Sequence, residues 1–257
     1  QGCDYGIAWQ YCDTAMISGS TLAANGTSGL YFDYCTDNTI ETNTITGNTS
    51  HGVYFLSNDN NNSVRGNYVQ GNQGRGFELT GACQNNLFAD NVVDSNTLDA
   101  FRLQGSSGNT LLRNQTNGNL RGPNVVSGNN NLLIGNTSWN NVEQGFTIDG
   151  GTSNTLSGNV SDSNGDYQLY HVNAASGNIF SRNNVAMPST WPDSGVFNGN
   201  VNFLDCRINW WSSSNEDSIA ATLANAVDNQ GLTMGSWVKE FLRLLDTDAN
   251  GCLKIDE

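Results

Sequence analysis

Asparagines spaced five residues apart, with an apolar residue between each pair, recur along most of this chain. Ile40 and Ile45, for example, lie between the three asparagines of the triplet that begins at Asn38. The triplets begin at Asn38, Asn62, Asn86, Asn109, Asn131 and Asn154, and a shortened one begins at Asn178. Successive starts are 24, 24, 23, 22, 23 and 24 residues apart, by subtraction of these positions. Such a period predicts stacked units that bury their apolar faces against one another.

A segment with strict alternation follows each triplet, usually after a glycine. In residues 53–55, Val53 and Phe55 are expected to point one way and Tyr54 the other. Each unit is therefore predicted to hold three short strands joined by turns, with glycine or asparagine at corners that need a positive φ.

Winding such units produces a parallel β-helix, whose coils lie about 4.8 Å apart. Equivalent asparagines would then stack and form amide ladders between coils. A helical solenoid is disfavoured because residues 1–200 lack long segments of 3.6-residue period, and leucine is too scarce for leucine-rich repeats. We predict an all-β solenoid of about eight to nine coils over residues 1–205, followed by a small α-helical appendage over residues 206–257.

The repeat N-x-[apolar]-x-x-N-x-[apolar]-x-x-N-x-x-x-G-[apolar]-x-[apolar] resembles the parallel β-helix repeats of NosD-type proteins. These belong to the wider group of right-handed, carbohydrate-associated β-helix proteins, so the resemblance implies a right-handed parallel β-helix. That group includes polysaccharide lyases, epimerases, binding proteins and surface proteins, and the resemblance therefore leaves the activity open. Asn209-Trp210-Trp211 also resembles the N-[aromatic]-W-G motif that follows the last coils there, with Ser212 in place of the glycine.

The asparagine repeat stops near Cys206, and two helices are predicted beyond it. Residues 214–217 resemble a helix start, and Ile219, Leu223 and Val227 follow at helical spacing. We expect this helix to cap the open end of the coil stack. A second helix is predicted over 237–245.

The segment 246–257 matches a twelve-residue EF-hand loop at each diagnostic position. Its predicted Ca²⁺ ligands are Asp246, Asp248, Asn250, the carbonyl of Cys252 and the carboxylate of Glu257. Gly251 supplies the sharp turn. Lys254 at position 9 and the lack of an exiting helix depart from the motif, so the alternative is a metal-free acidic loop.

The charge balance narrows the range of partners. Lysine and arginine number 10 against 24 aspartates and glutamates, which gives a net charge of −14 and a pI near 4.2. This argues against nucleic acid and anionic lipid as partners. No run approaches the roughly 20 apolar residues of a membrane span. Two histidines and three methionines without ligand spacing do not support copper delivery.

Cys12 and Cys35 lie one repeat apart and are expected to stack on neighbouring coils, within reach of a disulfide. The alternative is two buried thiols. A disulfide would favour export, and we expect a secreted, extracellular or cell-surface protein. Six N-x-[S/T] sequons occur, and Asn61, in a polar turn, is the best candidate for glycosylation. The chain begins inside a coil, and we interpret it as a processed or trimmed product.

The repeat also aligns the outward side chains of coils two to five. One column is predicted to hold Tyr31, Tyr54, Glu78 and Arg102, and the adjacent corner column to hold Ser28, His51, Arg75 and Asp99. Candidates for catalysis are His51 or Tyr54 as acid or base, and Arg75 or Arg102, beside Asp99, to neutralise a sugar carboxylate. Candidates for sugar binding are Tyr31, Tyr54, Glu78 and Arg102. The alternative is a plain surface with an ordinary Glu78–Arg102 ion pair worth about 0–1 kcal/mol.

These observations leave three hypotheses for function. The first is a non-catalytic extracellular structural or surface β-helix that binds Ca²⁺ and contacts carbohydrate. The second is a polysaccharide lyase or epimerase, although no D-P-H-D segment like that of the alginate epimerases occurs. The third, suggested by the two chain ends, is a piece of a larger filament or multidomain surface protein.

Overall fold

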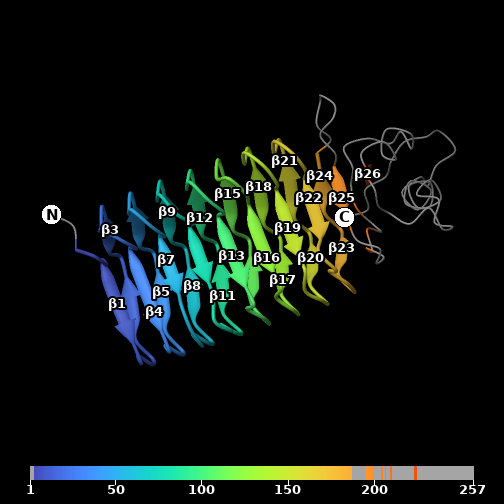
Figure 1. Ribbon diagram of the computed structural model, residues 1–257. Helices are drawn as coiled ribbons and strands as arrows, with labels where there is room; N and C mark the ends of the chain where they lie inside the picture. Colours follow the sequence, from blue (N-terminus) through green and yellow to red (C-terminus); the bar gives the residue numbers. More distant parts are fainter. Residues whose placement is uncertain are drawn as a thin grey trace, which may run out of the picture.

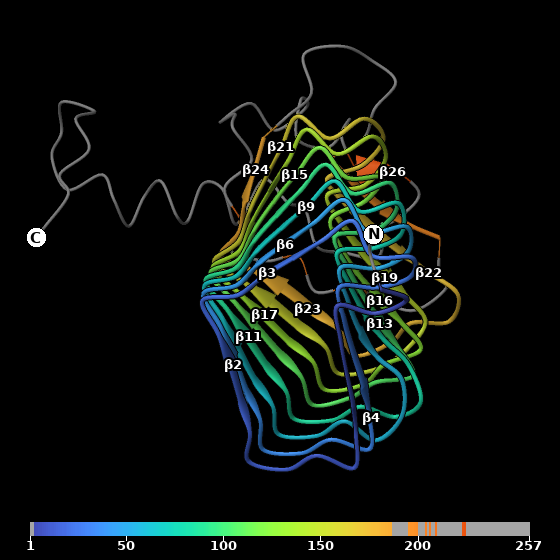
Figure 2. The ribbon, with the colours of Figure 1, turned by 90° about the vertical axis from the view of Figure 1, so that its left-hand side faces the viewer.

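The protein is a parallel β-helix in which successive strands of the chain enter three different sheets (Figure 1). The computed structural model describes residues 3–186 and 195–199, together with residues 204, 206, 209, 223 and 224. Seen along its axis, the chain winds around one central core that the three sheets enclose (Figure 2). The predicted fold is therefore confirmed.

The strands follow one another in register from coil to coil. Among the described residues, sheet A contains β1 (Ile7–Gln10), β4 (Leu30–Asp33), β7 (Val53–Phe55), β10 (Phe77–Leu79), β13 (Phe101–Gln104), β16 (Pro123–Val126), β19 (Phe146–Asp149), β22 (Leu169–Val172), β25 (Val196–Asn198) and β26 (Leu223–Ala224). Sheet B contains β2 (Met16–Ser18), β5 (Thr39–Glu41), β8 (Ser63–Arg65), β11 (Leu87–Ala89), β14 (Thr110–Leu112), β17 (Leu132–Ile134), β20 (Thr155–Ser157) and β23 (Ile179–Ser181). Sheet C contains β3 (Thr21–Ala23), β6 (Thr44–Thr46), β9 (Tyr68–Gln70), β12 (Val92–Asp94), β15 (Gln115–Asn117), β18 (Thr137–Trp139), β21 (Val160–Asp162) and β24 (Asn184–Val185). We number the coils by their sheet A strand, from coil 1 at β1 to coil 9 at β25.

The core is built from the inward positions of the alternating segments, as the sequence pattern predicts. Phe32 stacks on Phe55 and Phe77 stacks on Phe101, each with ring centroids 4.8 Å apart. All four rings are fully buried, and Phe88 of sheet B packs edge-on against three of them. Stacking and edge contacts of this kind stabilise a core beyond simple area burial.

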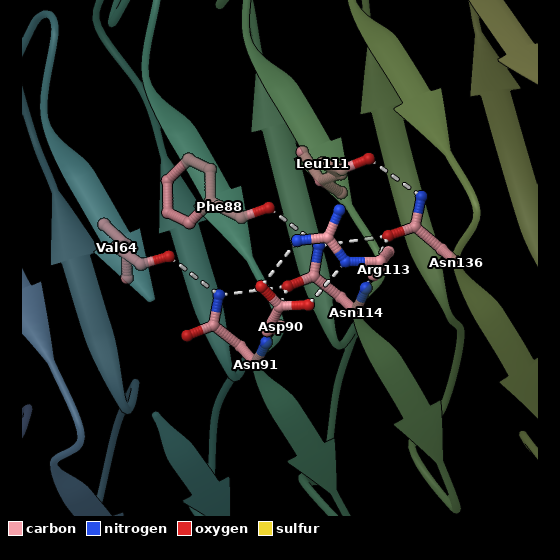
Figure 3. Close-up of polar contacts among 8 residues, drawn as sticks. All are labelled: Val64, Phe88, Asp90, Asn91, Leu111, Arg113, Asn114 and Asn136. Atoms are coloured by element: carbon pink, nitrogen blue, oxygen red, sulfur yellow. Dashed lines mark hydrogen bonds and ion pairs between the residues drawn. The ribbon is translucent and has the colours of Figure 1, made fainter. Parts of the chain in front are cut away.

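Buried asparagines connect the coils at the three corners. Asn91 shows the pattern in Figure 3: its Nδ2 donates to the Val64 carbonyl and to Asn114 Oδ1, at 3.0 Å each. Its backbone N–H donates to the same oxygen at 3.0 Å. Asn114 repeats these contacts with Phe88 and Asn136. The ladders satisfy corner backbone groups that would otherwise be buried without partners.

The ladder continues farther than the asparagine triplets of the sequence. Asn183 donates its backbone N–H and its Nδ2 to Asn209 Oδ1, at 2.9 and 3.0 Å. Asn209 Nδ2 in turn donates to the Phe180 carbonyl at 2.7 Å. Asn209, which the sequence suggested only as part of a motif after the last coil, thus extends the middle asparagine column.

Part of the segment predicted as a capping helix is a strand. Leu223 and Ala224 form β26, which pairs in parallel with Val196 and Phe197 of β25. An open sheet edge offers unpaired backbone groups, and strand addition satisfies them where a helix would not. The remainder of both predicted helices, and the EF-hand loop over 246–257, lie outside the described residues.

Cys12 and Cys35 are free thiols, so the structure does not contain the disulfide predicted between them. They do lie on neighbouring coils, since the adjacent pair Asp13 and Thr36 form a parallel bridge. The Cys35 Sγ faces the Trp9 carbonyl at 3.4 Å and accepts from the Cys12 backbone N–H at 3.4 Å. The Cys35 sulfur therefore contacts backbone groups of Cys12 and Trp9 and is not bonded to the Cys12 sulfur.

The sequons differ sharply in accessibility. Asn25, Asn48, Asn114, Asn136 and Asn159 are buried in the ladders. Asn61 is exposed, in a turn with φ of 58°. Only this last asparagine presents its side chain to an external enzyme, and its glycosylation stays a prediction. Within the described ranges, the chain has no helix of the length and apolarity that crossing a bilayer requires.

Candidate functional site

The outward face of sheet A brings the predicted site residues together. The outer column consists of Tyr31, Tyr54, Glu78, Arg102, Asn124, Thr147, Tyr170 and Phe197, paired strand to strand. The turn column beside it consists of Ser28, His51, Arg75, Asp99, Arg121, Gln144 and Tyr167. The column assignments made from the repeat are thus confirmed, and the structure extends both columns to coil 8 or beyond.

His51 is held in one protonation state. Its Nδ1 accepts the backbone N–H of Arg75 at 3.1 Å. Burial, together with the charge of Arg75, lowers the pKa of the imidazole to about 4. The ring is therefore neutral at physiological pH, and with Nδ1 engaged as an acceptor its proton lies on Nε2. In this state Nε2 donates a hydrogen bond and cannot accept a proton, which disfavours His51 as a general base.

A ladder of ions follows the turn column. Arg75 Nε lies 3.0 Å from Asp99 Oδ2, to which it donates, and 2.9 Å from Glu78 Oε2. Arg121 continues the ladder with contacts to Asp99 Oδ1 at 3.3 Å and to Glu143 Oε2 at 2.6 Å. The predicted Glu78–Arg102 surface pair is wrong in this respect: the ion contact of Glu78 is with Arg75, on its own coil, and Glu78 is 4% exposed.

Gln144 joins this ladder to the next coil. Its Oε1 accepts from Arg121 Nε at 2.8 Å, and its Nε2 donates to Asp166 Oδ2 at 2.9 Å. The guanidinium groups of Arg75 and Arg121 are thus committed to protein acceptors. Because their charges are compensated, neither is available to neutralise the carboxylate of a substrate without breaking a contact.

Buried polar atoms without a hydrogen-bond partner concentrate on this same face. Those found among the described residues are Asp33 Oδ1, Glu78 Oε2, Arg102 Nε, Asn124 Oδ1 and Thr147 Oγ1. Glu78 Oε2 differs from the others because it has the 2.9 Å ion contact with Arg75 Nε, without hydrogen-bond geometry. The last four belong to four consecutive coils of the outer column, from coil 4 to coil 7. An unsatisfied buried polar atom costs about 1–3 kcal/mol, so such a row is expected where a ligand or ordered water completes the contacts.

Aromatic side chains stand at both ends of this polar row. At the N-terminal end Tyr31 contacts Tyr54 with ring centroids 5.8 Å apart, and His51 lies 5.2 Å from Tyr54. At the other end Tyr170 stacks on Phe197 at 5.0 Å and on Tyr167 at 5.4 Å. All are partly exposed. The face therefore has a polar centre between two aromatic platforms.

The sequence predicted the N-terminal part of this face and missed the rest. Arg121, Asn124, Thr147 and Tyr170 were not among the predicted site residues. The repeat alone could have placed them, since each follows the previous member of its column by one period. Their partners could not be read in this way, because a salt bridge depends on side-chain direction as well as on column.

The fold and this face define a class of protein: a parallel β-helix with a continuous polar and aromatic surface along one sheet. The family model described as periplasmic copper-binding protein (NosD) matches residues 1–114 and 80–195, which together span more than half of the sequence. The chain belongs to this NosD family.

Solved structures with the same fold include several enzymes that act on alginate. A mutant of the periplasmic alginate epimerase AlgG has a TM-score of 0.71 and 19% identity, over 77% of this chain and 50% of that one. The A-module of mannuronan C-5 epimerase AlgE6 from Azotobacter vinelandii has a TM-score of 0.66 and 17% identity, over 77% and 58%. An alginate lyase from Paenibacillus sp. str. FPU-7 has a TM-score of 0.63 and 15% identity, over 78% and 77%.

These similarities establish the fold, and at such identities they establish no activity. The chain spans only about half the length of the AlgG epimerase. No curated protein sequence matches the chain significantly.

Among the described residues, the side chains do not fit copper, which the family description names. Within the described ranges, no group of three or more histidine, cysteine, aspartate or glutamate side chains is arranged to hold a metal. His51 lies in coil 3, and His171 lies buried in coil 8, with Nδ1 2.7 Å from Asn198 Oδ1 and Nε2 3.0 Å from Asn178 Nδ2. The two imidazoles that copper would prefer are thus on different coils, and three of their four ring nitrogens are engaged. The predicted Ca²⁺ ligands lie outside the described residues.

Proposed function

We propose that this protein binds an extended polysaccharide along the outward face of sheet A, as an exported, carbohydrate-contacting β-helix. The observation that supports the proposal is the row of unpaired buried polar atoms on coils 4 to 7. Coils are about 4.8 Å apart, a distance comparable to the length of one sugar unit. A glycan lying parallel to the helix axis would therefore place one sugar unit over each coil.

The aromatic platforms support the same orientation. Apolar faces of sugar rings pack against aromatic side chains, and polar groups between such platforms fix orientation. Tyr31 and Tyr54 on coils 2 and 3 and Tyr170 on coil 8 would contact the two ends of the glycan. Arg102, Asn124 and Thr147 would contact its middle.

Glycan binding to this face is tested by titration calorimetry with a panel of oligosaccharides and a triple variant, Tyr54→Ala/Arg102→Ala/Asn124→Ala. We expect the triple variant to lose binding while its circular dichroism spectrum stays that of the native protein. Arg113→Ala is the matched control, because Arg113 pairs with Asp90 on a sheet B corner, away from the face. Retention of full affinity by the triple variant would exclude this face as the binding site.

A lyase or epimerase is the second candidate function, favoured by the contact between His51 and Tyr54 and by the activities of the alginate enzymes that share the fold. Tyr54 would act as acid or base, with Arg102 facing the sugar carboxylate. Release of unsaturated uronide, measured as ultraviolet absorbance against a polysaccharide panel, tests for a lyase. Its loss in a folded Tyr54→Ala/Arg75→Ala/Arg102→Ala variant would assign the reaction to this face.

Calcium binding at 246–257 is proposed separately, on the loop sequence alone. Asp246, Asp248, Asn250, the Cys252 carbonyl and Glu257 supply the oxygen ligands of an EF-hand loop. Titration of the purified protein with Ca²⁺ should show one site that Asp246→Ala removes. An unchanged titration in that variant would exclude the loop.

A further inference from the structure

We infer that the outward face of sheet A selects a neutral, hydroxyl-rich glycan over a polyuronate. This rests on the proposed glycan binding and adds the chemical class of the ligand. The first observation is the type of the unpaired atoms. Three of them, on Asp33, Glu78 and Asn124, are oxygens that accept hydrogen bonds, and Arg102 Nε is a donor.

The hydroxyl groups of a neutral sugar match this set. A hydroxyl donates one hydrogen bond and accepts others, so it can satisfy Glu78 Oε2, Asn124 Oδ1 and Arg102 Nε alike. An ionised carboxylate only accepts. It would contact Arg102, leave Asn124 Oδ1 unsatisfied, and bring a second negative charge next to the Glu78 carboxylate, which already contacts Arg75.

The second observation is the charge of the face. On coils 4 to 8 the outer column, the turn column and their immediate neighbours hold three arginines against five carboxylates: Arg75, Arg102 and Arg121, and Glu78, Asp99, Glu143, Asp149 and Asp166. The difference is 3 − 5 = −2. Arg75 and Arg121 are already in contact with three of these carboxylates.

A polyuronate would bring one negative charge per sugar unit to this surface. Arg102 Nε is the unpaired donor on this face among the described residues, and Glu78 lies directly beside Arg102 in the outer column. Two like charges about 4 Å apart repel each other even at the dielectric constant of water, and they repel more strongly near a protein surface. Repetition over several coils would oppose binding of the acidic polymer.

The test compares glycans that differ at C6, where the acidic member of each pair has a carboxylate, by titration calorimetry of the full chain in EDTA at low and high ionic strength. The pairs are mannohexaose against hexamannuronate and methyl-esterified against free hexagalacturonate. We expect at least one uncharged member to bind about tenfold or more tightly than its acidic counterpart. We also expect salt to change the affinity of the uncharged member less than twofold. Tighter binding of the acidic members, weakening as salt rises, would overturn the inference while leaving glycan binding intact. Absence of binding by both members of both pairs would instead remove the proposed function, and this inference with it.

Charge variants test whether the outward face of sheet A causes the preference for uncharged glycans. Glu78→Gln should raise the affinity for the acidic member several-fold, because it removes the carboxylate beside Arg102. Asp90→Asn makes the same change in net charge on a sheet B corner. It should leave the ratio of the affinities for the uncharged and acidic members unchanged. Glu143→Gln, whose native side chain is about one-third exposed, provides the same test should Glu78→Gln fail to fold. An equal response to the Asp90 variant and to the face variants would show that overall charge, and not this face, sets the preference.

Discussion

Asp59 Oδ1 accepts the backbone N–H of Cys35 at 2.7 Å, so a carboxyl group lies in a buried column next to a thiol. The same corner position is filled on other coils by small side chains, namely Cys12, Cys35, Cys83, Ser106, Gly128, Gly151 and Ala175. Asp59 is fully buried, and its carboxyl oxygens contact the backbone N–H of Cys35 and the Cys83 thiol, which are uncharged donors. Burial raises the pKa of this carboxyl to about 7.

Asp59 should therefore make stability fall as pH rises. Its pKa is higher in the folded than in the unfolded chain, so the folded state binds the proton more tightly. The contribution of protonated Asp59 to the free energy of unfolding is fully present below about pH 4. It is lost between about pH 4 and pH 7, and its order of magnitude is roughly 4 kcal/mol.

Asp59→Asn isolates this effect, because asparagine keeps an acceptor for Cys35 and does not titrate. Urea unfolding at pH 4 and pH 8 should show similar stabilities for both proteins at the lower pH and a more stable variant at the higher pH. Parallel pH profiles for the two proteins would rule out Asp59 as the titrating group.

Removal of a ladder asparagine should destabilise the fold far more than removal of a surface one. Asn114→Ala takes the acceptor from Asn91 and the donor from the Phe88 carbonyl, all within the core. We expect a loss of about 3–5 kcal/mol, from two or more buried groups left without partners. Asn117→Ala, on the outward side of the adjacent strand, should cost less than about 1 kcal/mol. Equal urea midpoints for the two variants would contradict a structural role for the ladder.

His51 should titrate near pH 4 and carry its proton on Nε2 above that pH. Nitrogen–proton correlation spectra of the imidazole report both the midpoint and the tautomer. Because the pKa of His51 is lowered, its contribution to stability has the opposite sign to that of Asp59: it is lost as pH falls from about 6.5 to about 4. A midpoint near 6.5, or a proton on Nδ1, would remove the argument against His51 as a general base.

The two aromatic platforms should respond differently to ligand length. Tyr54→Ala and Tyr170→Ala should each weaken binding of a hexasaccharide roughly threefold to tenfold, the range expected for loss of one aromatic contact. A trisaccharide spans only about three coils and cannot reach both platforms. It should therefore be sensitive to one substitution at most, and equal losses with trimer and hexamer would contradict a glycan that lies along the whole face.

The repeat allowed much of this site to be predicted. Because coil spacing is constant, a period of 22 to 24 residues sets which side chains share a column, and His51, Tyr54, Arg75 and Asp99 were placed correctly from it. Contacts within and between columns were less predictable. Arg75 contacts Glu78 and Asp99, whereas sequence spacing suggested Arg102 as the partner of Glu78, because rotamers and local burial select among neighbours at similar distances.

The sequence by itself determined the architecture: the asparagine period, the alternation of Val53, Tyr54 and Phe55, and the glycine corners admit one stacked fold. Only the tertiary structure decided which outward atoms lack a partner, that Cys12 and Cys35 remain thiols, and that Leu223 joins sheet A as a strand. Those outcomes depend on side-chain directions and on edges exposed by the whole assembly. The repeat period of a sequence determines which residues stack on neighbouring coils. It does not determine the directions of their side chains, which decide the contacts that form.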